Sequence, residues 1–267
     1  EMIYDADGNR YADTYTVSID DVFADLAANT MTVTFSASDP AIVPEVLVSF
    51  YDSNTKNFIV PSHAYDASAN CPGGRRDNCR FEWAPGDTSP LFPALSGSGT
   101  GGDPWVLTVD MAAWLPGETN DGSANGQPNM SVPDLISDGI ITKAEVTITP
   151  ELTLNPDTED EVEVALNAAL QTFDLGANGF VDNYFKGDNA IVDQEKCNVC
   201  HDQLAVTFHS GSGRGGDIAM CRNCHNPTFT GSHLEMNSRS IENYVHAIHS
   251  FQEFDTDDIF NGGVSDQ

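Results

Sequence analysis

The clearest pattern in the chain is an alternation of apolar and polar residues. Residues 30–38 place Met31, Val33 and Phe35 on one face of an extended segment and threonine or serine on the other. A period of two is typical of a β-strand with one buried face. Other short strand-like runs occupy residues 14–19, 46–51, 58–60, 80–83, 104–109 and 140–149. Because turn-forming Gly, Pro and Asp residues separate these runs, the sequence predicts an antiparallel β-sandwich or a Greek-key barrel.

Two stretches depart from this pattern. Residues 162–173 alternate at their start but favour helix in their middle, and residues 110–115 resemble a single helical turn. From about residue 188 onward, apolar runs become too sparse to build a hydrophobic core. We therefore expect an antiparallel β domain over residues 1–187. Over residues 188–267 we expect a loop-rich segment with short helices that is organised by another group.

Two copies of the pentapeptide Cys-x-x-Cys-His lie in that C-terminal segment. They are Cys197, Cys200 and His201, and Cys221, Cys224 and His225. This spacing is the attachment signature of c-type haem, in which two thiols bond to one porphyrin. The following histidine then becomes the proximal axial ligand of the iron. The alternative is a zinc site, because two Cys-x-x-Cys pairs can form a Cys₄ cage. Since a zinc site does not require a histidine directly after each pair, the sequence predicts two covalently attached haems.

A haem iron has a sixth coordination site, so distal ligands are expected among the other histidines. His246 and His249 are three residues apart, and on a helix they would share a face. Two imidazoles on adjacent turns cannot both bind one iron, but they can serve two haems packed side by side. His209 precedes a glycine-rich turn that lets the backbone approach a flat macrocycle closely, and a polar loop residue is the alternative. His63 and His233 are interpreted as surface residues.

The three distal candidates exceed the two ligands that two haems need. The surplus imidazole suggests a third haem motif beyond Gln267, and the chain stops without a closing element. We therefore expect this sequence to be the front part of a longer multihaem protein, incomplete at its C-terminus.

Acidic residues strongly outnumber basic ones. The chain has 41 Asp and Glu against 11 Lys and Arg, a net charge of −30, which repels nucleic-acid phosphates and anionic lipid headgroups. Nucleic acid is therefore not an expected partner, and no apolar run of about 18 or more residues predicts a transmembrane segment. Because haem c is attached outside the cytoplasm, we expect an exported protein. The two remaining cysteines, Cys71 and Cys79, then predict a disulfide in an oxidising compartment.

The N-terminus contains a candidate calcium loop. Oxygen-bearing side chains recur around a glycine turn at Asp5, Asp7, Asn9 and Asp13. The register differs from that of an EF-hand, and an ordinary turn rich in Asp and Asn explains the same residues. Both interpretations, Ca²⁺ binding and a simple turn, stay open at this point.

The C-terminal motifs resemble those of the OmcA/MtrC family of outer-membrane decahaem cytochromes. The resemblance rests on Cys197-Asn-Val-Cys-His-Asp-Gln-Leu-Ala-Val-Thr-Phe-His209, Cys221-Arg-Asn-Cys-His-Asn-Pro and Val245-His-Ala-Ile-His-Ser. It implies an antiparallel β domain ahead of the first haem and bis-histidine ligation. His201 and His225 would be proximal, and His209, His246 and His249 distal. The implied location is extracellular or on the outer-membrane surface, and the periplasm is the alternative for an exported protein.

The resemblance also implies a function, which is electron relay to an extracellular acceptor. Metal oxides, flavins and partner cytochromes are such acceptors, and further haem domains of the same protein would be its neighbours. Two axial histidines fill both iron sites, which favours electron transfer over substrate chemistry. The alternative is a multihaem reductase with one open iron. Because proton-donating Lys and Arg are scarce in the C-terminal segment, we favour a non-enzymatic electron carrier.

Overall fold

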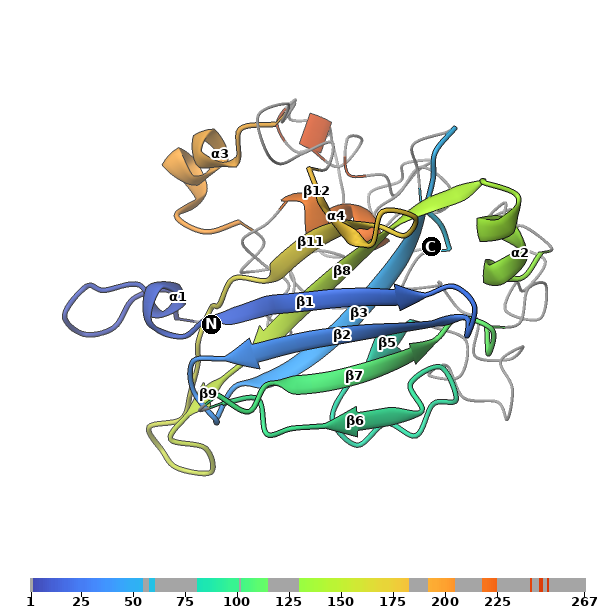
Figure 1. Ribbon diagram of the computed structural model, residues 1–267. Helices are drawn as coiled ribbons and strands as arrows, with labels where there is room; N and C mark the ends of the chain where they lie inside the picture. Colours follow the sequence, from blue (N-terminus) through green and yellow to red (C-terminus); the bar gives the residue numbers. More distant parts are fainter. Residues whose placement is uncertain are drawn as a thin grey trace, which may run out of the picture.

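Most of the chain that the structure describes consists of antiparallel strands in two layers (Figure 1). The computed structural model describes residues 2–54, 58–60, 81–100, 102–114, 130–182, 192–204 and 218–224, together with residues 241, 245, 246 and 249. A few short helices lie around the strands, as expected from the sequence.

One layer is a four-stranded sheet with the order β1, β2, β7, β6. Its strands are β1 (Val17–Asp25), β2 (Thr30–Ala37), β6 (Ala94–Ser96) and β7 (Trp105–Asp110). The register sets Val33 of β2 between Val22 of β1 and Leu107 of β7, and all three side chains are buried. The alternation in the sequence therefore forms the inner face of this sheet.

The second layer is a six-stranded sheet with the order β12, β11, β8, β3, β4, in which β5 also pairs with β3. Its strands are β3 (Val43–Asp52), β4 (Phe58–Val60), β5 (Glu82–Trp83), β8 (Ile141–Glu151), β11 (Ala169–Asp174) and β12 (Gly179–Val181). A separate two-stranded ribbon joins β9 (Thr153–Leu154) to β10 (Val162–Glu163). Figure 1 shows β1, β2 and β7 in front of β3 and β8, so the two sheets form a sandwich.

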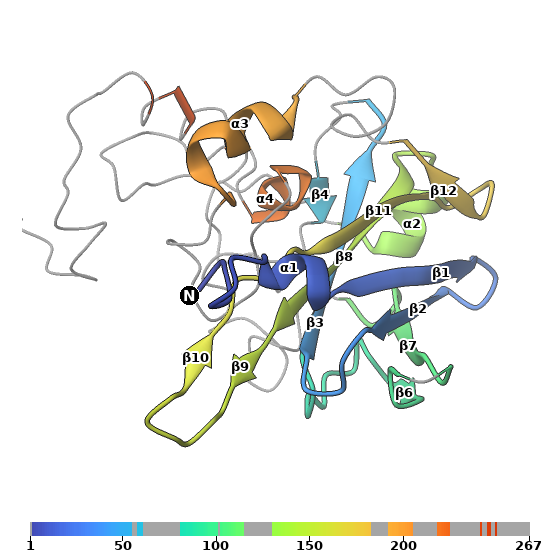
Figure 2. The same cartoon turned by 90° about the vertical axis from the view of Figure 1, so that its left-hand side faces the viewer.

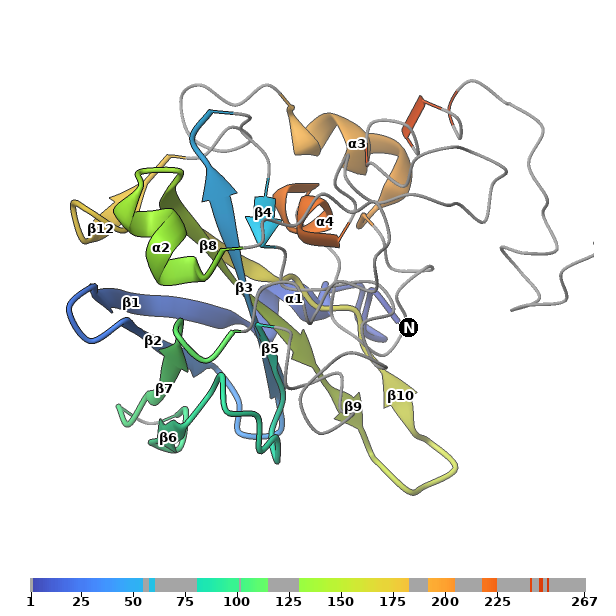
Figure 3. The same ribbon diagram turned by 90° about the vertical axis from the view of Figure 1, so that its right-hand side faces the viewer.

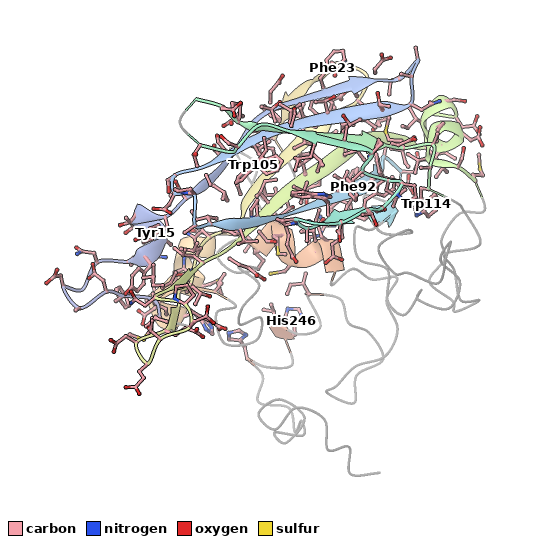
Figure 4. All side chains as sticks on the ribbon, turned by 90° about the horizontal axis from the view of Figure 1, so that it is seen from below. Tyr15, Phe23, Phe92, Trp105, Trp114 and His246 are labelled. Carbon is pink, nitrogen blue, oxygen red and sulfur yellow. The ribbon has the colours of Figure 1, made fainter. Side chains whose placement is uncertain are left out.

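Aromatic rings fill the space between the sheets. The Phe35 ring of β2 lies 5.2 Å from that of Trp105 and 6.3 Å from that of Trp83, which belongs to the opposite sheet. The fully buried Phe50 of β3 makes an edge-to-face contact with Phe81. Figure 4 shows Trp105 and Phe92 between the two layers of strands. This shared core confirms the mainly antiparallel β fold expected from the sequence.

Four short helices accompany the sandwich: α1 (Tyr11–Thr14), α2 (Val132–Ser137), α3 (Gln194–His201) and α4 (Ile218–Cys224). The sequence pattern did not indicate α2, because six residues are too few to show a helical period. A local cap explains why it forms. The Ser131 hydroxyl accepts a hydrogen bond from the Asp134 backbone N–H (3.2 Å), and a proline occupies the first turn.

In the described residues, neither of the two stretches that departed from the strand pattern forms a helix. Residues 162–173 contain β10 and most of β11, so the early alternation outweighs the helix-forming residues in the middle. The expected helical turn at residues 110–115 is instead a turn closed by Asp110. Its carboxylate accepts hydrogen bonds from the backbone N–H groups of Ala112 and Ala113 at 2.9 and 3.2 Å. A short side chain that bonds to its own backbone favours a turn at this strand end.

The turn between β11 and β12 links the two sheets through Asn178. Its carboxamide accepts a hydrogen bond from the Ala24 backbone N–H (2.8 Å) and donates one to the Ala24 carbonyl (2.9 Å). Ala24 lies on β1, the edge strand of the four-stranded sheet, so Asn178 satisfies backbone groups that strand pairing leaves open. Asn178 also adopts a left-handed backbone conformation (φ 54°), which asparagine tolerates better than most residues.

Replacing Asn178 with alanine is expected to lower the free energy of unfolding by about 1–3 kcal/mol, because two partly buried backbone groups lose their partner. Asn155→Ala is the matched control. Asn155 has a similar φ of 49°, but its carboxamide donates to an exposed carbonyl of Asp160. Chemical denaturation measures both losses, and equal losses would show that backbone conformation alone accounts for the effect.

Candidate haem site

The first motif lies at the C-terminal end of α3. Cys197, Cys200 and His201 are three and four positions apart, so they share one face of the helix. Cys200 and His201 are exposed, Cys197 is half-buried, and both thiols are free. The helix ends directly after the histidine, where Asp202 has a φ of 53°. Two thiols and an imidazole thus stand on one side of a helix, as attachment to a single porphyrin requires.

His249 lies next to His201, although the two are far apart in the sequence. Their ring centres are 6.0 Å apart and their planes are inclined by 76°. The Nδ1 atom of His249 lies 2.7 Å from the backbone carbonyl oxygen of Val245. Because a carbonyl can only accept a hydrogen bond, Nδ1 is the donor in this contact, and in the neutral ring Nε2 then carries the lone pair. His249 is therefore oriented as metal-ligating histidines commonly are, with one ring nitrogen held by the protein and the other available.

The second motif lies on α4, which packs against the outer face of the six-stranded sheet. Figures 2 and 3 show α4 beside this sheet, on the side away from β1 and β2. Ala219 and Met220 pack against Leu170 of β11. The carboxamide of Asn223 donates a hydrogen bond to the Thr147 hydroxyl of β8 at 2.9 Å. Cys221 is half-buried and forms no disulfide.

Some of the buried polar atoms without a hydrogen-bond partner lie in or beside the motifs. They are Oδ1 of Asn198 and Oδ1 of Asn223, which lie between the cysteines of each motif, and both carboxamide atoms of Gln203. Gln203 lies two residues after the first motif and is only 3% exposed. An unpaired buried amide is costly, so Asn198 and Gln203 leave polar contacts at the first motif that another group would complete, whereas Asn223 faces the sheet. The thiols of Cys197 and Cys200, an oriented imidazole and incomplete polar contacts together fit a covalently attached porphyrin at the first motif.

Several residues singled out in the sequence are outside the described residues. These are Cys71, Cys79, His63, His209, His225 and His233. The proposed disulfide and the roles of His209 and His225 therefore stay predictions. His246 is exposed, and Figure 4 shows it on the same side of the sheets as α4. Within the described residues, no group of three or more His, Cys, Asp or Glu side chains could hold a metal ion.

The candidate calcium loop is closed by its own hydrogen bonds. The Asp5 carboxylate accepts bonds from the backbone N–H groups of Asp7 (2.9 Å) and Asn9 (2.8 Å) and from the Asn9 carboxamide (3.0 Å). The bond from the Asn9 side chain, followed by those from nearby backbone N–H groups, lowers the pKa of Asp5. This is the geometry of a turn stabilised by aspartate, and Asp13 lies apart from it on α1. Calcium binding stays a prediction.

Residues 189–265 match the family model described as outer membrane cytochrome MtrC/MtrF-like, domains II/IV. This segment is therefore similar to the MtrC/MtrF-like outer-membrane cytochromes. The matched range, called the cytochrome segment below, contains both Cys-x-x-Cys-His motifs, His246 and His249. The match confirms the resemblance that was drawn from the sequence motifs. The number of haems on this chain stays a prediction.

The chain as a whole is similar to the crystal structure of MtrC from Shewanella baltica OS185, with 15% sequence identity and a TM-score of 0.45. The similarity covers 89% of this chain and 33% of the MtrC chain, so this chain spans about one third of that relative's length. No curated protein matches the chain. Among the helices of the described part, none is long and apolar enough to cross a membrane.

Three features of the site were not anticipated from the sequence. They are the Val245 carbonyl that orients His249, the contact between Asn223 and Thr147, and the buried carboxamide of Gln203. The first two depend on which segments meet in space. One signal was present for the second: Asn223 is two positions from Cys221, which puts it on roughly the opposite side of a helix. Val199 has the same spacing from Cys197 and is 83% exposed, so this signal alone does not identify the contact.

Proposed function

We propose that the chain carries two c-type haems, at Cys197 and Cys200 and at Cys221 and Cys224, and passes electrons through them. The similarity of the cytochrome segment to an outer-membrane cytochrome family supports the general function. Cys197 and Cys200 on α3 and Cys221 on α4 form no disulfide, which supports two attachment sites. A bound haem would supply a one-electron iron couple. The chain contributes the covalent attachment, the axial ligands and the surroundings that set the reduction potential.

The observation that carries this proposal is the pairing of His201 with His249. A metal ion holds an imidazole nitrogen at about 2.0–2.1 Å, so two rings bound on opposite sides of one iron have centres roughly 6 Å apart. The separation of 6.0 Å in this structure meets that requirement. Nε2 of His249 is available because the Val245 carbonyl holds Nδ1. We therefore assign His201 as the proximal ligand and His249 as the distal ligand of the first haem.

Proposed roles for the other histidines follow from this assignment. His225 is the proximal ligand of the second haem by its place in the motif. His246 and His209 are then the candidates for the second haem and for a further one. His246 and His249 are three positions apart, so with His249 assigned to the first haem, His246 serves a neighbouring one.

Two axial histidines on each iron favour relay over catalysis. Two histidines on each iron would fill both of its axial sites, and such a haem would supply one-electron transfer without ligand exchange. The net charge of −30 stabilises ferric over ferrous iron and so lowers the reduction potential. We propose that the electrons pass to an extracellular acceptor such as a metal oxide, a flavin or a partner cytochrome. In this proposal, residues 1–187 form a β domain that acts as a docking or spacing module beside the haem segment at residues 188–267.

The proposal is tested by counting haems and by observing their spin state. A preparation from a host that matures c-type cytochromes should give two haems per chain by intact mass and by the pyridine haemochrome spectrum. Its optical and EPR spectra should be low-spin, and the reduced protein should not bind carbon monoxide. An open iron that binds carbon monoxide would favour the reductase alternative, and a colourless protein that contains zinc would contradict the proposal.

A further inference from the structure

The two motifs relate very differently to the β-sandwich. In the first motif, the second spacer residue is Val199, whose side chain is 83% exposed. The corresponding residue of the second motif is Asn223, which is fully buried against the six-stranded sheet. The second spacer residue is therefore turned toward solvent on α3 and toward protein on α4. Haem attachment alone does not explain this difference, because the signature does not specify its spacer residues.

The sheet offers Asn223 a specific partner. Thr147 lies on the outer face of β8, directly opposite Leu47 of β3 and Leu170 of β11. All three side chains are buried. Within this cross-strand row the Thr147 hydroxyl lies between two buried leucines, and Asn223 donates its hydrogen bond there. Because Thr147 and Asn223 are both fully buried, separating them leaves two polar groups without water, which opposes displacement of α4 from the sheet.

The neighbouring residues of α4 strengthen the same contact. Met220 (3% exposed) and Ala219 (1% exposed) pack against Leu170. The guanidinium of Arg222, the first spacer residue, lies 5.5 Å from the centre of the Phe58 ring of β4, within the range of a cation–π interaction. Cys221 is two positions from both Ala219 and Asn223, and at roughly 100° per residue it lies on nearly the opposite side of the helix. The sheet therefore holds the back of α4 and leaves the Cys221 side for a porphyrin.

We propose that Asn223 and Arg222 are positioning residues through which the β-sandwich fixes the place of the second haem. This inference rests on the proposed function for the haem itself, but the docking of α4 stands independently of it. The sandwich is then more than a spacer, because the outer face of its six-stranded sheet holds α4 and thereby the second haem in place. The first haem is held by α3 without an equivalent contact from Val199.

The test uses Thr147→Val in the full chain with its haems attached, because this change removes the hydroxyl while keeping the shape and leaves both motifs intact. Amide hydrogen exchange over residues 218–224 should become about ten-fold faster or more, since Asn223 loses its buried acceptor. Exchange over residues 194–201 should not change. One reduction potential should shift, and it should be the one that disappears when Cys221 and Cys224 are replaced.

Two variants serve as controls for the hydroxyl. Thr147→Ser keeps it and should restore native exchange and both native potentials. Thr149→Val removes a hydroxyl from another fully buried threonine of β8, one that bonds to Glu45 instead of α4, and should leave residues 218–224 unchanged. Native exchange and native potentials in Thr147→Val would overturn the proposal.

The unmodified protein gives a second test, in case Thr147→Val does not fold. Residues 218–224 should exchange roughly ten-fold more slowly than residues 194–201, because only the former pack on the sheet through their spacer residues. Equal rates would overturn the proposal. The haem count separates the proposed function from the proposed anchoring of α4. Two haems with unprotected residues 218–224 would refute only the anchoring, whereas absent haems would refute the proposed function.

Discussion

Replacing His249 with alanine is expected to convert the first haem from a six-coordinate low-spin site to one with an open or water-bound position. The His249 ring lies 6.0 Å from that of His201, and in the proposed arrangement the two would hold a single iron, so the substitution would remove one of its two axial ligands. A high-spin component should appear in the optical spectrum and account for about half of the haem. The reduced variant should bind carbon monoxide, and added imidazole should restore the low-spin spectrum.

Two controls make this result specific. Val245→Ala changes the neighbouring side chain but keeps the carbonyl that lies 2.7 Å from Nδ1 of His249, so its spectrum should stay low-spin. The second control is a background in which Cys197 and Cys200 are serine, so that the first haem is absent. There His249→Ala should have no further effect. A high-spin component in that background would mean that His249 ligates a different iron.

The sandwich is the part of the structure that the sequence predicts best. Met31, Val33 and Phe35 alternate with threonines, and the structure buries all three in the shared core. Such an alternation is local information, because a strand with one buried face needs a period of two wherever it lies in the fold. The periodic pattern did not predict the helix α2, because its formation depends on the Ser131 cap.

The polar face of β8 shows where the alternation misleads. Thr147 and Thr149 occupy the positions that a sandwich normally turns to solvent, yet both are fully buried. The cause is tertiary, because α4 covers Thr147 and supplies its hydrogen-bond partner. A seven-residue helix without a long apolar stripe gives no sign in its sequence that it will pack on a sheet.

For the haem site too, some features can be predicted from local sequence and others depend on the tertiary structure. The identity of the thiols and of His201 follows from the spacing of the motif alone. The sequence also marked His249 as a distal candidate, but it could not name its partner, because the pairing joins segments far apart in the chain. The structure brings the two imidazoles together and adds the Val245 carbonyl that fixes which nitrogen is available. Assignment of ligands to individual haems is thus a tertiary property.

Replacing Cys221 and Cys224 with serine is expected to remove one haem from the chain and to leave the other in place. A serine hydroxyl does not add to a porphyrin vinyl group, so the second site loses its covalent attachment. The first site keeps Cys197, Cys200 and the paired histidines. Intact mass should show a single haem, and the pyridine haemochrome absorbance per chain should fall to about half of the native value.

The matched variant, with Cys197 and Cys200 replaced by serine, decides between two haems and the rival zinc cage. Two independent porphyrins predict that either pair of substitutions removes half of the cofactor. A single Cys₄ zinc site instead predicts that either pair abolishes metal binding altogether, because two thiolates do not complete a structural cage. The contact between Asn223 and Thr147 involves no thiol, so α4 should still protect residues 218–224 from exchange when Cys221 and Cys224 are serine. Complete loss of cofactor in either variant would therefore count against independent haems, and not against the docking of α4.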